Sequence, residues 1–226
     1  QLHKYRLLRT TWEQQGITFL AMNSDASDRP ADVRLMDNLH NFDIPVLLDD
    51  SQLVAESLGL SKAGEIVVLE PSRGQILYRG GLDTDPVQAR PALNIEAVAG
   101  TTVFADVLSA AVADDAASIE QTITTDAVGC ELQFPAKQMH ASYTPDYATE
   151  VAPILEEKCI SCHVEGGIAP FAMDSHMMVQ GWSPMMKEVM MTKRMPPAQV
   201  DPNVKHFTNA RYMDAEELQT LVHWID

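Results

Sequence analysis

The chain has 226 residues, of which 46% are hydrophobic and 21% are charged, a composition that suits one large or two modest globular domains and excludes a disordered chain. Its formal net charge of −16 at pH 7 excludes nucleic acid and anionic lipid as partners, because an acidic surface repels both. No apolar run reaches the length of about 20 residues that crosses a bilayer, so no membrane-spanning helix is expected.

The first part of the chain alternates predicted helices with predicted strands. Helices are expected over residues 1–14, 30–39, 51–58 and 101–113, and strands over 17–22, 45–48 and 65–70, the last turning at 71–74 into a strand over 75–79. Strands that are separated by helices and followed by a hairpin predict a mixed sheet covered by helices. Residues 114–125, acidic and rich in Ala and Thr, are interpreted as the start of a connector that continues to about residue 144.

The last part of the chain carries no strand pattern and is expected to be all α-helical. A first helix is predicted over residues 147–158. A second helix is predicted from about Asp174, with a break at Gly181 and a restart at Ser183, where Pro184 suits a first helical turn. A final helix is expected from Asp214, whose spacing to Glu217 resembles a capping box.

Two cysteines and a histidine lie in one short motif, Cys159-Ile160-Ser161-Cys162-His163. This spacing is the one by which haem is attached covalently, with the thiols bonded to the porphyrin and the histidine bound to the iron. A structural zinc site would need two more ligands at comparable spacing, and a redox pair normally follows a strand and opens a helix. The motif therefore predicts one c-type haem, an iron cofactor whose attachment places the protein in the periplasm or an equivalent compartment.

Residues 147–226 resemble a single-haem c-type cytochrome domain. The similarity rests on the CISCH motif at 159–163, on GGIAPF at 166–171 and on RMPP at 194–197. The whole arrangement looks like the cytochrome segment that bacteria fuse behind redoxin domains. The resemblance also implies that a carbonyl near Pro170 accepts a hydrogen bond from the second ring nitrogen of His163.

Residues 1–135 resemble a peroxiredoxin-like redoxin domain of the thioredoxin fold, and residues 136–146 then form a linker. The matching stretches are GITFLAMNS at 16–24, PVLLD at 45–49, the strand from 65 with its hairpin, and AVGC at 127–130. The strand and reactive cysteine that such domains place before the first helix are absent, and Gly64 stands where a cis-proline is expected. Without a thiol nucleophile this half is not expected to perform disulfide or peroxide chemistry.

The second axial ligand of the iron is predicted to be Met195, with His206 as the alternative. Pro196 and Pro197 stiffen the loop after Met195, and a rigid loop can hold a weak thioether bond to iron. Most of the other methionines of this half are expected to fill the core around a large flat cofactor. Four other histidines are expected to be surface or core residues and not ligands: His3, His40, His140 and His223.

Two further expectations concern the third cysteine and the two ends of the chain. Cys130 is either a buried small residue or a thiol whose partner lies before Gln1. The start at Gln1 and the abrupt end at Asp226 are interpreted as a processed or trimmed piece of a longer polypeptide.

The sequence predicts an electron carrier more strongly than a self-sufficient enzyme. An iron with both axial positions filled by protein passes single electrons to redox partner proteins, with the redoxin-like half as a docking or structural module. One alternative is a haem subunit of a thiol oxidoreductase or a copper monooxygenase-like fusion whose catalytic part lies elsewhere. Another is an accessory subunit of a larger extracytoplasmic or membrane-associated complex.

Overall fold

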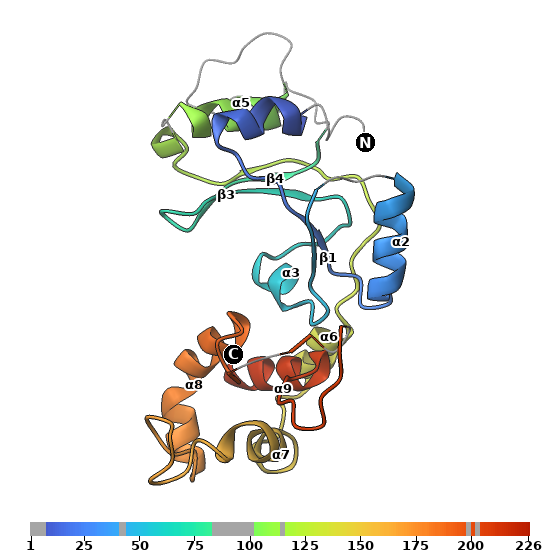
Figure 1. Cartoon of the computed structure of the whole chain (residues 1–226). Coiled ribbons are helices and arrows are strands. Elements are labelled where there is room, and N and C mark those ends of the chain that lie inside the picture. The colour runs from blue at the N-terminus through green and yellow to red at the C-terminus, as the bar shows by residue number, and fades with distance from the viewer. Residues whose placement is uncertain (1–7, 41–43, 83–101, 114–115, 198–199, 202–203) are drawn as a thin grey trace. The chain divides into compact units, whose positions relative to one another are not determined.

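The computed structural model describes residues 8–40, 44–82, 102–113, 116–197, 200–201 and 204–226 (Figure 1). The expected N-terminal helix is present over 8–12 and continues as η1 Glu13–Gln15, while its residues 1–7 lie outside the described part. Contacts divide the chain into two compact units. Unit 1 comprises residues 1–23, 32–48 and 57–132, and unit 2 comprises 24–31, 49–56 and 133–226.

Unit 1 contains two small sheets. Strands β1 Ala21–Asn23 and β2 Val46–Leu48 pair in parallel, with helix α2 Pro30–His40 between them in the chain. Strands β3 Ile66–Glu70 and β4 Gln75–Gly80 form the expected antiparallel hairpin, and β5 Ile123–Thr124 pairs in parallel with β4. The chain is therefore a mixed α/β protein, as predicted, but the prediction of one sheet is wrong. No described strand joins the two sheets.

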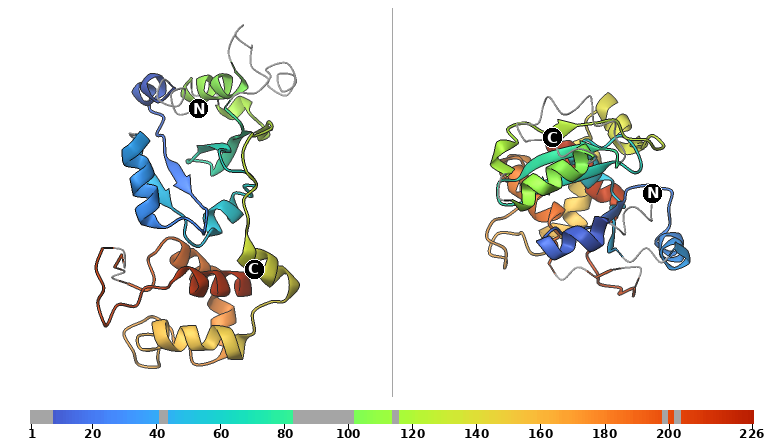
Figure 2. Two further views of the ribbon diagram at one scale, coloured as in Figure 1. Left: turned by 90° about the vertical axis from the view of Figure 1, so that its right-hand side faces the viewer. Right: turned by 90° about the horizontal axis from the view of Figure 1, so that it is seen from above.

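The core of unit 1 lies between the hairpin sheet and helix α5 Val103–Val112, which runs along one face of that sheet (Figures 1 and 2). The helix buries Val103, Phe104, Val107 and Leu108, which are three and four residues apart and so share one face. Phe104 packs its ring against Tyr78 of β4 with 5.6 Å between centroids. Thr102 caps the helix by accepting a hydrogen bond from the Ala105 amide.

Three elements lie in the segment that the sequence suggests is a connector: the short helix η3 Ala116–Ser118, strand β5 and helix α6. Strand β5 forms because Ile123 is buried and because Thr122 donates a hydrogen bond to the Ile76 carbonyl oxygen. A single large apolar residue among threonines gives too weak a strand pattern to be recognised. Helix α6 Pro135–Ser142 begins with proline in its first turn and buries none of its residues, so it lacks an apolar stripe.

Helices form most of unit 2. A continuous helical segment comprises η4 Tyr147–Val151, α7 Ala152–Leu155 and η5 Glu156–Ile160, and it is followed by α8 His176–Met191 and α9 Ala215–Ile225. No strand lies among the described residues from 133 onward, in agreement with the prediction. The short helix α3 Leu53–Ser57 has all but its last residue in this unit.

The predicted break in α8 is wrong. The helix runs through Pro184 without interruption, with Ser175 as its N-cap. Proline lacks the amide that would bond to the carbonyl four residues earlier, that of Gln180. The hydroxyl of Ser183 donates to this carbonyl oxygen instead, at 2.9 Å, and so satisfies the acceptor that proline leaves open. The capping box of α9 is confirmed, since Asp214 accepts from the Glu217 amide while the Glu217 carboxylate accepts from the Asp214 amide.

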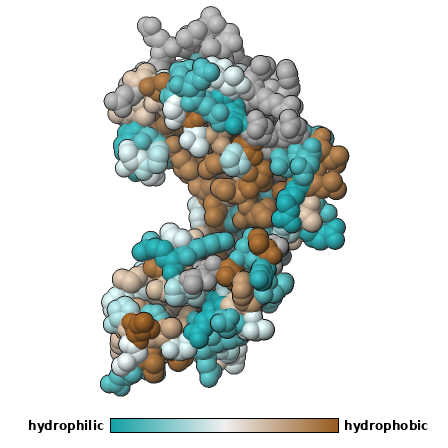
Figure 3. All heavy atoms as spheres, viewed as in Figure 1, coloured by the Kyte–Doolittle hydropathy of each residue, from teal (hydrophilic) through white to brown (hydrophobic). Residues whose placement is uncertain are grey.

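Several large apolar side chains of unit 1 lie on the surface. Figure 3 shows apolar atoms gathered over α2 and the strands beside it. The exposed side chains in or next to these elements are Leu20, Leu35, Met36, Leu39, Leu47 and Leu48. The predicted helix therefore forms at α2, but its apolar residues are not buried.

Candidate functional site

The Cys159–His163 motif lies at the C-terminal end of the long helical segment of unit 2. The amides of Cys162 and His163 both donate to the Cys159 carbonyl oxygen, at 3.1 and 3.0 Å. This closes one tight turn that carries both thiols and the imidazole. The sequence predicted a helix before the motif, and the structure confirms it.

The ring of His163 is held by a backbone carbonyl. Its Nδ1 lies 3.0 Å from the Phe171 carbonyl oxygen, and the residue is 8% exposed. Since a carbonyl only accepts, Nδ1 carries the proton and Nε2 keeps a lone pair that can bind a metal. The expected acceptor was a carbonyl near Pro170, and the carbonyl observed belongs to the next residue.

A loop that folds back on the motif brings this carbonyl into place. The Ala169 amide donates to the Cys162 carbonyl oxygen, and the Met173 amide donates to that of His163 at 2.9 Å. Gly167 permits the tight return, because a Cβ there would lie 2.6 Å from the Cys162 carbonyl oxygen. The backbone of 162–173 therefore fixes the orientation of the imidazole, as is usual for a histidine that binds a metal.

An apolar cluster of unit 2 supports the site. The Phe171 ring packs against the His163 ring and stacks on Trp182, with 4.6 Å between centroids in both pairs. The cluster includes Cys159 and Ile160 at its border, and its buried members are Val151, Leu155, Met173, Val179, Met186, Met190 and Leu221. Three of these are methionines, but Met177, Met178 and Met185 of the same half are exposed, so the expectation that the methionines of this half fill the core holds only in part.

The two thiols of the motif are free and partly buried. Burial raises the pKa of Cys159 to about 11, with Arg211 acting in the opposite direction. A reactive or zinc-binding cysteine needs a thiolate, and hence a lowered pKa. Within the described residues no group of three or more His, Cys, Asp or Glu is placed to hold a metal ion. The raised pKa of Cys159 weighs against a reactive redox pair.

Arg211 is a residue of this site that the sequence analysis missed. It donates a hydrogen bond to the Ser161 hydroxyl, and its Nη1 lies 3.9 Å from the Cys162 sulfur. The contact places a positive charge beside the motif from a segment 49 positions away in the chain. No local pattern around Arg211 indicates such a contact.

The two candidates for the second axial ligand lie on other segments. Met195 follows α8, its amide donates to the Val189 carbonyl oxygen at 3.0 Å, and its side chain is 37% exposed. Pro196, directly after it, is buried, while His206 lies exposed in the segment before α9. The structure therefore brings together Cys159, Cys162, His163 and the residue after Pro170. The choice between Met195 and His206 as the second ligand stays a prediction.

The residues of the motif fit a covalently bound haem. Two thiols on one turn can each form a thioether, and the Nε2 lone pair of His163 is available to iron. Cys130 is exposed, so the first of its two alternatives, a buried small residue, is wrong. None of the helices in the part of the chain described above is long and apolar enough to cross a membrane.

No known protein family, curated protein or solved structure matches this chain. The resemblance to redoxin and cytochrome domains therefore stays a prediction. The function of the site is inferred from the residues of the motif and their contacts.

Proposed function

We propose that the chain is an extracytoplasmic electron-transfer protein that carries one covalently attached c-type haem. Cys159 and Cys162 would form the thioethers and His163 would be the proximal ligand. The observation that carries this proposal is the hydrogen bond from His163 Nδ1 to the Phe171 carbonyl oxygen, which leaves Nε2 free for a metal on the turn that holds both thiols.

The residues around the motif have distinct roles in this proposal. The Phe171 carbonyl orients the imidazole and increases its basicity, since it accepts the second ring proton. The bound haem supplies reversible one-electron chemistry at its iron. Met195 would fill the second axial position and so exclude water and small ligands from it. The apolar cluster that includes Phe171 and Trp182 would keep water away from His163.

We also propose that residues 1–135 adopt the thioredoxin-like fold and serve as a docking or structural module. The support is the β1–α2–β2 unit with parallel strands, followed by the β3–β4 hairpin. The acidity of the chain suits a basic surface on its redox partner, because complementary charge speeds the encounter of two proteins.

The first prediction tests the covalent haem. When the chain is exported to the periplasm of a host that matures c-type cytochromes, we expect a red protein whose intact mass exceeds that of the polypeptide by one haem. Under denaturing conditions an alkylating reagent should then modify Cys130 alone. A colourless protein with the bare polypeptide mass and all three thiols alkylated would overturn the proposal.

The second prediction concerns the distal ligand. Met195→Ala should remove the sulfur-to-iron absorption band at the far-red end of the spectrum completely, and it should let carbon monoxide bind without displacing a protein ligand. The reduction potential should fall, because methionine–histidine ligation raises it. His206→Ala is the matched control and should leave the band intact. A band that persists in Met195→Ala, or disappears in His206→Ala, would assign the position to another residue.

A further inference from the structure

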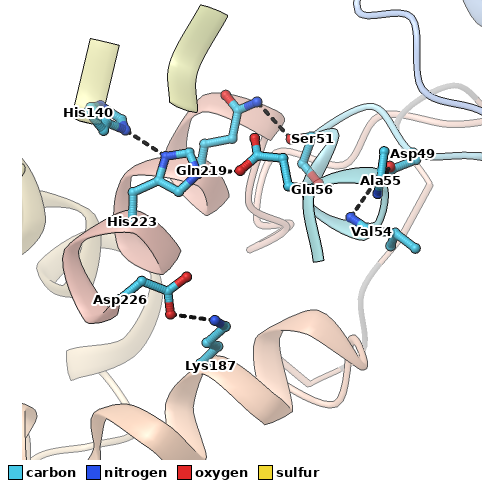
Figure 4. A network of polar contacts seen from close by, with 10 residues as sticks. All are labelled: Asp49, Ser51, Val54, Ala55, Glu56, His140, Lys187, Gln219, His223 and Asp226. Carbon is cyan, nitrogen blue, oxygen red and sulfur yellow. Dashed lines mark hydrogen bonds and ion pairs between the residues drawn. The ribbon is translucent and has the colours of Figure 1, made fainter. Parts of the chain in front are cut away.

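Three side chains from three separate elements of unit 2 meet in one contact (Figure 4). His140 of α6 and His223 of α9 bring their Nδ1 atoms to 2.7 Å from each other. His223 Nε2 lies 3.1 Å from Glu56 Oε2 of α3, and the side chains of this second pair are each 9% exposed. Histidine spacing in the sequence gave no indication of this arrangement, which joins residues 83 and 167 positions apart.

The contact allows only certain numbers of protons. Because the Glu56 carboxylate accepts, His223 carries a proton on Nε2. The two facing Nδ1 atoms can share one proton, with either ring as the donor. The hydrogen bond therefore survives with two or three protons on the two rings. A fourth proton turns both Nδ1 atoms into donors, and two positively charged rings then face each other at 2.7 Å.

Glu56 contacts His223 with only one of its two carboxylate oxygens. Its other carboxylate oxygen, Oε1, is buried and has no hydrogen-bond partner among the described residues. A buried carboxylate with so little compensation depends on the hydrogen bond from His223. The position of Glu56 is fixed from the other side by Asp49, whose carboxylate accepts from the amides of Val54 and Ala55 at the start of α3.

We propose that His140, His223 and Glu56 form a proton-sensitive contact that holds α6 and the 49–56 segment on α9 at neutral pH and releases them on acidification. A second hydrogen bond joins the same segments, from the Gln219 side chain of α9 to the Ser51 carbonyl oxygen at 2.7 Å. This hydrogen bond contains no titratable group, so the pH dependence comes from the imidazoles.

The other charged groups nearby do not reverse this dependence. The edge of His140 faces the Tyr143 ring, whose hydroxyl donates to Glu150 at 3.0 Å. Burial lowers the pKa of His140, the charge of His223 lowers it further, and the carboxylates of Glu150 and Glu56 act in the opposite direction. Lys187 of α8 and Asp226 at the end of α9 pair with each other (Figure 4).

The sign of the effect follows from the lowered pKa. Above the ordinary histidine pKa of about 6.5, His140 is neutral in both the folded and the unfolded chain. Below this pH, His140 binds a proton in the unfolded chain but stays neutral in the intact contact. The contact therefore weakens as the pH falls. The weakening is at most about tenfold for each pH unit below the ordinary histidine pKa, because the protonation of the unfolded chain changes tenfold per unit.

Hydrogen exchange at pH 7.5 and pH 5.5, corrected for the intrinsic exchange rate, tests the proposal on the full chain. We expect protection of the amides in α6 and α3 to fall about tenfold on acidification, while α8 keeps its protection. His140→Gln should abolish the fall, because an amide can either donate to or accept from His223 and does not titrate. His40→Gln, at an exposed position on α2, should behave like the wild type.

His223→Gln provides a second variant with the same expectation, in case His140→Gln does not fold. Unchanged protection of α6 in the wild type would overturn the proposal. So would an equal fall in wild type and either glutamine variant, or an equal loss in α6 and α8. None of these results depends on whether haem is bound, so the outcome is distinct from that of the proposed function.

Discussion

A chain with serine at both motif positions, Cys159→Ser/Cys162→Ser, is expected to carry no haem that survives denaturation. A thioether to the porphyrin requires sulfur, and the serine hydroxyl does not form the corresponding bond under the same conditions. Each single variant should retain one thioether and therefore keep a reduced amount of attached haem. Haem staining of a denaturing gel, together with the intact mass, measures this loss, which should be complete in the double variant.

Cys130→Ser is the matched control for this experiment. Cys130 is exposed and lies in unit 1, so its replacement should leave haem attachment at the wild-type level. Cys159 borders the apolar cluster, and a hydroxyl there would cost about 1–3 kcal/mol. The helical content of the variants must therefore be compared by circular dichroism. Haem that stays attached in the folded double variant would contradict the assignment of the motif.

The predictions that held are those based on local patterns. The capping box of α9 depends on Asp214 and Glu217 alone, and the hairpin between β3 and β4 depends on a short turn between two apolar runs. The helix ahead of the Cys159–His163 motif follows from its own apolar stripe. In each case the residues that determine the structure are within a few positions of one another, so the sequence displays them directly.

The predictions that failed needed contacts between distant residues or compensation by a neighbour. The break expected in α8 overlooked the hydroxyl of Ser183, which replaces the hydrogen bond that Pro184 cannot make. Strand β5 exists because β4 offers it a partner, and its own two residues give little signal. In the sequence, His223 is one residue of an amphipathic helix and carries no sign of a special contact. Only the folded chain places His140 and Glu56 beside it.

The cofactor could be predicted from the motif, but the contacts of its residues could not. The spacing of Cys159, Cys162 and His163 indicates the cofactor directly, whereas the hydrogen bond to His163 depends on how the following loop returns. The resemblance placed the acceptor near Pro170, and the loop places it at Phe171. Arg211 could not be predicted, because only the folded chain brings its segment beside Ser161.

A second large effect is expected in unit 1, where Gly129→Ala should destabilise the fold by about 3 kcal/mol. Gly129 lies against residues 61–63, to which the following segment pairs. The Ala63 amide donates to the Cys130 carbonyl oxygen at 2.8 Å, and the Leu132 amide donates to that of Ser61 at 2.9 Å. A Cβ at Gly129 would overlap the Ala63 carbonyl oxygen and lie 2.8 Å from its carbonyl carbon.

The loss arises from this overlap and not from backbone strain, because Gly129 is not among the glycines with a positive φ. The backbone on both sides is fixed by the hydrogen bonds just described, so it cannot move aside without breaking them. Urea unfolding followed by circular dichroism measures the change. Gly181→Ala is the control of opposite sign: nothing lies within 4 Å of a Cβ there, and alanine inside α8 should stabilise by about 1 kcal/mol. A Gly129→Ala loss below about 1 kcal/mol would mean that the 61–63 segment yields to the added methyl group, and the pairing would then be weaker than its hydrogen bonds indicate.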